Sequence, residues 1–252
     1  MSDFVAPEEA SLLHEQGLDT FEALWNLPLV PVDEPNVRGK GISTVYRLCI
    51  GERSYFLKRQ SNYLTRTLRH PLKGETTLAR EFRNIRLYRQ RGIPALHAAF
   101  FGERNLPGER QALLLTPALD GWLDLHHYLL EWPELAEAER QDVLGTCGRL
   151  IRTLHSQGQK HSCLYPKHVF LRRQAGSMQA CLIDLEKTRP LLPIRMDRVA
   201  DIETLVRRAA AWDERCIRHL LASYLDVDGS DTRIDDWLQR LARRRADKES
   251  RG

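Results

Sequence analysis

The residues of this sequence best suited to catalysis or ligand binding lie in a polar loop beside an apolar strand. The segment HSCLYPKHVFL at 161–171 has the layout of a catalytic loop, with Cys163 where a catalytic acid would be expected. The apolar run ACLI that follows it leads directly into Asp184. A carboxylate at a strand end is suited to ligating magnesium. Acids often end strands without binding an ion. The loop and Asp184 therefore indicate a functional site only in combination with other residues.

Groups upstream of this loop suit the phosphates of a nucleotide. Lys58 ends the strand YFLK, where a lysine can pair with phosphate oxygens. Glu81 falls on the apolar face of a predicted helix, and an inward-facing acid needs a cation such as Lys58. The turn RGKGIS could bring backbone N–H groups onto phosphates; its candidate residues are Gly39, Gly41 and Ser43. Taken singly, these residues also fit a hairpin turn, a solvated lysine and an acid paired with a neighbouring arginine.

Periodicity predicts the elements that position these groups. Alternating β-formers predict a hairpin of strands 44–50 and 54–58, and apolar residues at helical spacing predict helices at 77–90 and 137–157. Gly158 ends the second helix. The remaining predicted elements are a short helical preface at 10–27, strands at about 95–101 and 112–116, a helix at 122–130, a small hairpin of HVFLRR and ACLIDL, and helices from Asp201 onward.

The order of these elements predicts an α+β chain of two lobes. A β-rich first part and a helical second part meet at a hinge near 117–121, and boundaries of this kind are common ligand sites. Thr116, at the end of the strand before the hinge, joins the candidate nucleotide-binding residues. We expect a helical preface at 1–31, a β-rich lobe at 32–117, a helical lobe at 118–247 and a disordered tail at 248–252.

Composition and charge exclude several classes of protein. The acidic start and the absence of a long apolar run argue against a secretory signal and a membrane span, so a cytoplasmic protein is expected. Five cysteines without a CxxC pair fit reduced thiols. Between positions 58 and 91, ten basic residues outnumber two acids, which suits an anionic partner or simply a solvated helix surface. This run lacks aromatic interleaving, which disfavours nucleic-acid binding.

The full set of motifs resembles the protein kinase fold. More closely, it resembles the lipopolysaccharide kinase family of bacterial sugar kinases, in the InaA-type branch related to heptose kinases of the WaaP type. The resemblance covers about 32–205 and rests on five segments: VDEPNVRGKGIS, YFLKRQ, LAREFRNI, HSCLYPKHVFL and LIDLEKTRP.

The resemblance implies ATP and magnesium as ligands. Lys58 would contact the α- and β-phosphates, Glu81 would hold Lys58, and Asp184 would ligate the magnesium ion. His168 stands where protein kinases have an asparagine ligand; since imidazole prefers softer ions, it could instead orient its neighbours. His161 would support the loop by hydrogen bonding, and Asp201 would brace it, unless Asp201 is an ordinary helix cap.

Cys163 is the main departure from the family pattern. Heptose kinases of this family have an aspartate there, which orients and deprotonates the acceptor hydroxyl. A thiol accepts hydrogen bonds poorly and has a pKa of about 8.5. Phosphoryl transfer needs little base strength, so a catalytic Cys163 and an inert buried thiol both stay open.

Two functions therefore follow from the resemblance. The first is an ATP-dependent kinase that phosphorylates a hydroxyl of a heptose-like sugar in the lipopolysaccharide core or another anionic glycoconjugate, with possible peripheral contact at the inner face of the inner membrane. The second is a kinase-fold binding or regulatory protein, a pseudokinase without phosphotransfer.

Overall fold

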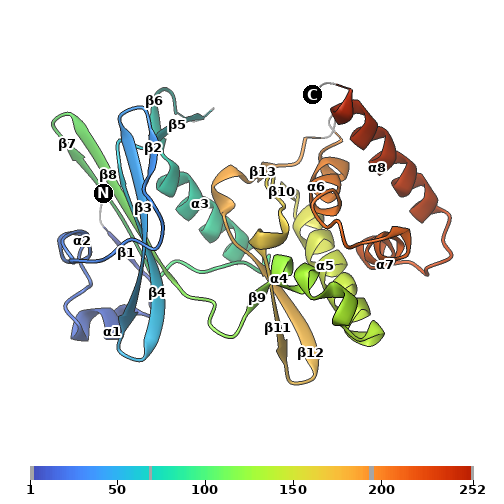
Figure 1. Cartoon of the computed structure of the whole chain (residues 1–252). Helices are drawn as coiled ribbons and strands as arrows, with labels where there is room; N and C mark the ends of the chain where they lie inside the picture. The colour runs from blue at the N-terminus through green and yellow to red at the C-terminus, as the bar shows by residue number, and fades with distance from the viewer. Residues whose placement is uncertain (1–2, 68–69, 193–195, 251–252) are drawn as a thin grey trace. The chain divides into compact units, whose positions relative to one another are not determined.

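The computed structural model describes residues 3–67, 70–192 and 196–250. The chain divides into two compact units (Figure 1). The first comprises Met1–Arg89 and Leu96–Asp120, and the second comprises Gln90–Ala95 and Gly121–Gly252.

The first unit is built on an antiparallel sheet with the strand order β1-β7-β8-β4-β3-β2. The predicted hairpin forms its centre, with Ile50 paired to Arg53 across a turn in which Gly51 has a φ of +58°. The strands are β1 (Phe4–Val5), β2 (Asn36–Arg38), β3 (Gly41–Ile50), β4 (Arg53–Ser61), β7 (Phe100–Leu106) and β8 (Glu109–Pro117).

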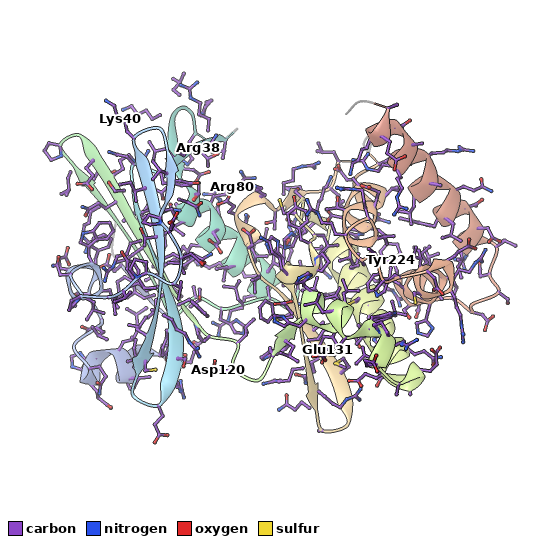
Figure 2. All side chains as sticks on the ribbon, in the orientation of Figure 1. Arg38, Lys40, Arg80, Asp120, Glu131 and Tyr224 are labelled. Carbon is purple, nitrogen blue, oxygen red and sulfur yellow. The ribbon has the colours of Figure 1, made fainter. Side chains whose placement is uncertain are left out.

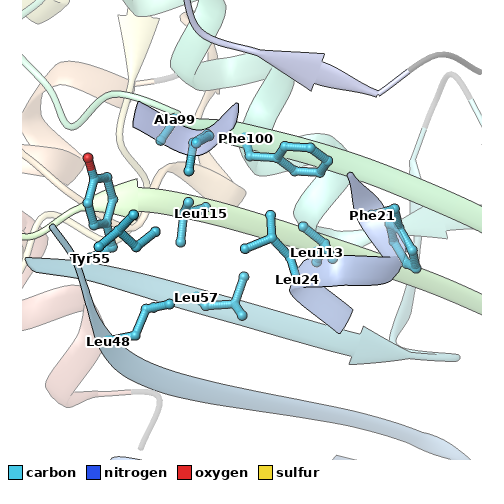
Figure 3. Close-up of a cluster of buried hydrophobic side chains, with 11 residues drawn as sticks. Phe21, Leu24, Leu48, Tyr55, Leu57, Ala99, Phe100, Leu113 and Leu115 are labelled. Atoms are coloured by element: carbon cyan, nitrogen blue, oxygen red, sulfur yellow. The ribbon is translucent and has the colours of Figure 1, made fainter. Parts of the chain in front are cut away.

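Alternation along the strands gives the sheet two apolar faces. One face packs against the short helices α1 (Ala10–Glu15) and α2 (Phe21–Trp25). Figure 3 shows this cluster, in which Leu57 and Leu115 of the sheet meet Phe21 and Leu24. The preface expected at 1–31 therefore contributes to the core of the first unit. Because successive side chains point to opposite faces, Lys58 must project to the other side.

Helix α3 (Thr77–Gln90) covers this other face. Its bounds match the predicted helix, and its buried residues include Leu78, Phe82 and Ile85. Phe82 stacks on Phe101 of β7, with ring centroids 4.3 Å apart and planes inclined by 11°. The helix face that carries Phe82 therefore meets the sheet face that carries Lys58.

Two sequence predictions for this unit were wrong. The strand predicted at 95–101 begins at Phe100 and continues to Leu106, so the segment GERN that we expected in a loop is paired with β8. The structure also contains an unpredicted hairpin of β5 (Leu64–Thr67) and β6 (His70–Thr76). Its residues lack strict alternation and include a proline, which hid the strands from a periodicity test.

The second unit combines helices with three short β pairings. The predicted small hairpin is present as β11 and β12, and β9 adds a third strand. Strands β10 and β13 form a separate pair. The elements are β9 (Leu123–Asp124), α4 (Leu125–Leu130), η1 (Trp132–Glu134), α5 (Glu137–Ser156), β10 (Gln159–Lys160), η2 (Pro166–His168), β11 (Val169–Gln174), β12 (Ser177–Leu182), η3 (Leu185–Lys187), β13 (Arg189–Pro190), α6 (Asp197–Val206), α7 (Glu214–Leu225) and α8 (Arg233–Glu249).

Helix α5 is the core element of the second unit and ends as predicted. Gly158 follows the helix with a φ of +68°, and its N–H donates to the carbonyl of His155. A left-handed residue at this position favours glycine. The same helix approaches α7 closely at Gly148, where an added Cβ would lie 2.5 Å from the carbonyl oxygen of Leu220.

The last described element is a helix that reaches into the expected tail. Helix α8 extends through Glu249, and Lys248 pairs with Glu203 of α6, so residues 248 and 249 of the expected tail belong to this helix. Glu203 is buried and also contacts Arg207 at 2.9 Å and Arg244 at 3.9 Å. This carboxylate fastens α8 to α6. Residues 251 and 252 of the expected tail lie outside the described residues.

The contact at Gly148 leads to a stability prediction. Gly148→Ala would place a methyl group against backbone atoms of α7, so we expect it to lower the free energy of unfolding by about 1–3 kcal/mol. Gly145→Ala in the same helix would meet only side-chain atoms, of which the flexible end of Arg149 is nearest at 3.1 Å, and the better helix propensity of alanine would offset these contacts. Urea unfolding of both variants would test this; equal stabilities would contradict the assigned packing.

Candidate functional site

Lys58 and Glu81 form a close ion pair within the first unit. Lys58 Nζ donates to both carboxylate oxygens of Glu81, at 2.8 and 3.0 Å. Glu81 is buried, whereas the Lys58 side chain keeps 28% of its surface exposed. The pair follows from two periodicities, since Lys58 points to the α3 face of the sheet and Glu81 lies on the apolar face of α3. Glu81 thereby fixes the ammonium group of a side chain that is partly exposed.

Gln60 is a supporting residue that sequence reasoning missed. Its side-chain nitrogen donates to Thr77 Oγ1 at 2.7 Å and Ser43 Oγ at 3.1 Å, and its oxygen accepts from the N–H of Leu78 at 3.2 Å. Gln60 thus ties β3 and β4 to the first turn of α3. The only sequence signal was its spacing, because residues 58 and 60 of one strand share a face.

The glycine turn has structural reasons for both of its glycines. Gly39 has a φ of +60°, and an added Cβ at Gly41 would lie 2.5 Å from the carbonyl oxygen of Asn62. The cations beside this turn, Arg38 and Lys40, are exposed (Figure 2). The third turn candidate, Ser43, accepts the hydrogen bond from Gln60. Thr116 is buried in β8. A role of these residues toward a nucleotide stays a prediction.

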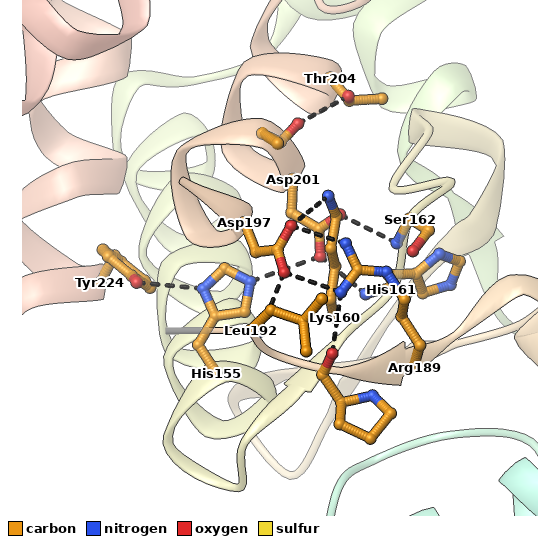
Figure 4. Close-up of polar contacts among 12 residues, drawn as sticks. His155, Lys160, His161, Ser162, Arg189, Leu192, Asp197, Asp201, Thr204 and Tyr224 are labelled. Atoms are coloured by element: carbon orange, nitrogen blue, oxygen red, sulfur yellow. Dashed lines mark hydrogen bonds and ion pairs between the residues drawn. The ribbon is translucent and has the colours of Figure 1, made fainter. Parts of the chain in front are cut away.

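In the second unit, Asp201 organises the start of the candidate loop. One carboxylate oxygen accepts from the N–H of His161 at 2.7 Å, and the other from the N–H of Ser162 at 2.9 Å (Figure 4). His155 lies 3.4 Å from the first oxygen. Asp201 is buried in the middle of α6, so it braces the loop and does not cap a helix. Ser162 has a φ of +69°, a conformation that these bonds help to maintain.

His161 has a structural position beneath the loop. It is fully buried, and its Nε2–H donates to the carbonyl of Ile183 at 2.9 Å. Burial lowers the pKa of His161, with the carboxylate of Asp201 acting in the opposite direction, so the ring is neutral near pH 7. The bond to Ile183 fixes the residue that precedes Asp184.

His168 and Asp184 lie together as the candidate metal ligands. Nδ1–H of His168 donates to the carbonyl of Cys163 at 2.8 Å, and Nε2 lies 3.3 Å from Asp184 Oδ2. Asp184 has a left-handed backbone, with φ +58° and ψ +60°, and its side chain is 39% exposed. A carboxylate oxygen suits magnesium, and an imidazole oriented through its other nitrogen is a usual metal ligand for softer ions. The two side chains are of types that bind divalent cations, but within the described residues no group of three or more His, Cys, Asp or Glu side chains gathers around them.

Cys163 is much less accessible than Asp184. Its residue surface is only 6% exposed, and its carbonyl accepts from both Tyr165 N–H and His168. Cys147 and Cys181 behave as core residues, since burial raises the pKa of each thiol to about 12. Cys163 is almost as buried as these two core cysteines. A catalytic thiol needs more exposure than this to reach an acceptor.

A second carboxylate, Asp197, fastens the strands that flank the loop. It accepts from Arg189 of β13 at 2.7 Å, from Lys160 of β10 at 3.1 Å and from the N–H of Leu192 at 3.0 Å (Figure 4). The hydrogen bonds from Arg189 are the main reason that the pKa of Asp197 lies well below its usual value. Sequence reasoning missed this cluster because its members are separated by up to 37 residues.

Many cations of the basic run at 58–91 are paired with other groups of the same chain. Besides Lys58, the cations Arg83 and Arg89 pair with Glu75 and Glu8. Arg59 donates to two backbone carbonyls near the end of α2. Arg69 lies outside the described residues. The run therefore offers less free positive charge than its composition indicated.

The two-unit α+β fold and the Lys58–Glu81 ion pair are typical of protein-kinase-like proteins. A solved structure of WaaP in complex with acyl carrier protein superposes with a TM-score of 0.70 at 21% identity, covering 98% of this chain and 99% of that one. Protein InaA from Escherichia coli (strain K12) is 27% identical over 173 residues, which is 68% of this chain and 79% of InaA. The expected fold class is confirmed.

A family model then identifies the chain more narrowly. Residues 22–224 match the lipopolysaccharide kinase (Kdo/WaaP) family, and the chain belongs to this family. The matched region contains every candidate residue from Gly39 to Asp201. The resemblance inferred from the motifs is therefore confirmed.

The Asp197 cluster leads to a pH prediction. Because the folded-state pKa of Asp197 is lowered, its stabilising effect is present above the unfolded value of 3.8 and is lost as pH falls through the folded value. We expect Asp197→Asn to cost about 3 kcal/mol at pH 7, and this difference from the unsubstituted protein to shrink below about pH 4. Asp142→Asn, which breaks a surface pair with Arg173, should cost under about 1 kcal/mol. A pH-independent Asp197 difference in urea unfolding would contradict the assignment.

Proposed function

We propose that this protein is an ATP-dependent kinase of lipopolysaccharide core biosynthesis that phosphorylates a hydroxyl of a heptose-like core sugar. The observation that carries the proposal is the Lys58–Glu81 pair, because a lysine held by a buried glutamate is a usual partner of nucleotide phosphates in kinases. Membership of the lipopolysaccharide kinase family supports the same reaction class. None of the helices among the described residues is long and apolar enough to cross a membrane. We place the protein in the cytoplasm, with peripheral contact at the inner membrane.

In this proposal each candidate residue other than Cys163 has a defined task. Lys58 contacts the α- and β-phosphates of ATP, and Glu81 holds its ammonium group. Gly39, Gly41, Ser43 and Thr116 complete the nucleotide contacts. Asp184 and His168 hold the divalent cation, which would neutralise phosphate charge when bound. Asp201 and His161 keep the loop in place. The acceptor oxygen bonds to the γ-phosphorus, the bond to the β–γ bridging oxygen breaks, ADP leaves, and the hydroxyl proton passes to water.

The low exposure of Cys163 favours a second candidate, a kinase-fold binding protein without phosphotransfer. A thiol with 6% exposure is poorly placed to receive a proton from a sugar hydroxyl. Against this, the transition state of phosphoryl transfer is loose, so positioning and charge neutralisation supply most of the acceleration. A missing general base costs about 10²–10⁴-fold in rate, which slows an enzyme without removing nucleotide binding.

Nucleotide binding is tested first at Lys58. We expect Lys58→Met to weaken ATP–magnesium binding at least about tenfold in calorimetry, because a charge-assisted contact to phosphate is lost. Lys73→Met removes an exposed lysine from the same unit and should leave the affinity unchanged. Equal affinities in both variants would contradict the assigned role of Lys58.

Phosphotransfer is tested at Asp184 and Cys163 with lipopolysaccharide core oligosaccharide as acceptor. Asp184→Asn should lower the rate at least about 100-fold. The matched control is Asp226→Asn, since Asp226 has nearly the same left-handed backbone and pairs with Arg152 away from the loop. Cys163→Ala should stay within about tenfold of the unsubstituted rate. If the protein binds ATP but never phosphorylates the acceptor, while Cys163→Asp gains activity, the binding protein is the correct function.

A further inference from the structure

The guanidinium of Arg208 lies on the aromatic ring of Tyr165 in the candidate loop. Its Cζ is 4.0 Å from the ring centroid. Arg208 follows the last residue of α6 by two positions, and its N–H donates to the carbonyl of Leu205. Asp201 lies within α6 and Arg208 lies just beyond its end, so the two residues reach the loop from neighbouring positions of one segment. Arg208 therefore meets the loop that Asp201 braces.

Stacking uses the face of a guanidinium and leaves its edge available. The N–H donors of arginine lie in the plane of the group, so an arginine stacked on an aromatic ring can still bind a carboxylate or phosphate through two parallel hydrogen bonds. Arg208 is exposed, and no carboxylate of the described residues pairs with it. Its neighbour Arg207 is different, because Arg207 Nε donates to the buried Glu203 at 2.9 Å.

Tyr165 gives Arg208 a fixed position relative to the candidate catalytic residues. The N–H of Tyr165 donates to the carbonyl of Cys163, and its own carbonyl accepts from the N–H of His168, both at 2.8 Å. The ring centroids of Tyr165 and His168 are 5.2 Å apart. His168 in turn lies 3.3 Å from Asp184. Arg208 is thus connected to the Asp184 pair through two rigid rings.

The loop itself carries a second exposed cation. Lys167 is in the short helix η2 beside His168, is exposed, and has no carboxylate partner in the described part of the chain. Arg208 and Lys167 therefore bring uncompensated positive charge to the loop from two elements. An anion is the ligand class that such a surface attracts.

We propose that Arg208 binds an oxyanion of the acceptor and thereby positions the acceptor at the loop. The ligand class is an anionic sugar, and the oxyanion is a phosphate or a carboxylate on that sugar. This inference rests on the proposed function, because it assigns the acceptor side of the same reaction. Arg208 is a positioning and specificity residue, and the phosphates of ATP are left to Lys58 and the metal.

Binding is tested without turnover on the full chain. We would follow the Nε–H NMR signal of Arg208, assigned with Arg208→Lys, while adding glucose 6-phosphate, glucuronate or glucose. The two charged sugars should shift the signal, and glucose should not. A signal unmoved by both charged sugars would overturn the inference. This titration needs no phosphotransfer, so it stays decisive even if the proposed kinase activity fails.

Turnover supplies the second test. Arg208→Gln should raise KM for core oligosaccharide by about 10- to 100-fold and leave KM for ATP within about threefold. Arg207→Gln should change neither, and Arg208→Lys should restore part of the loss. Dephosphorylated oligosaccharide distinguishes the sources: the difference between the unsubstituted protein and Arg208→Gln disappears if the oxyanion is a phosphate and persists if it is a carboxylate. An unchanged oligosaccharide KM in Arg208→Gln would overturn the inference while leaving the kinase activity established.

Discussion

The buried carboxylate of Asp201 is the interaction on which the second unit's candidate site depends. It accepts two adjacent backbone N–H groups, from His161 and Ser162, and so maintains a left-handed residue at the start of the loop. A carboxylate that accepts backbone donors in a buried position is strongly bound, and removing it would leave those donors unsatisfied. The bond from His161 to Ile183, and the contact of His168 with Asp184, both require the loop to keep this path.

Other buried acids hold elements together through cations. Glu81 holds Lys58, Glu75 binds Arg83, Asp197 joins Arg189 and Lys160, and Glu203 attaches α8. Each carboxylate is compensated by a cation from a different element, so burial is tolerated and the two elements are held in register. Lys167 and Arg208 stand apart from this scheme, because no described carboxylate compensates either of them. Their charge is available for a ligand.

The structure changes how Cys163 is understood. From the sequence it appeared as a substituted catalytic acid. In the fold, its backbone carbonyl has the defined task, because it accepts from Tyr165 and His168 and thereby orients the imidazole toward Asp184. A backbone carbonyl is present whatever the side chain, so the loop geometry tolerates a cysteine. In the proposed kinase, the catalytic demand would fall on charge and positioning by Asp184, His168 and Arg208.

Local patterns determined most elements and the Lys58–Glu81 pair. Alternation in 44–58 and helical spacing in 77–90 each specify a face, and the two faces carrying Lys58 and Glu81 had to meet. Helix α5 and its end at Gly158 could likewise be predicted from the sequence, because a terminating glycine and an apolar stripe are local properties. Only the tertiary structure decided the bracing by Gln60, the Asp197 cluster and the Arg208–Tyr165 stack. These contacts join residues far apart in sequence, and no local pattern specifies which of many arginines or carboxylates will meet once the chain has folded.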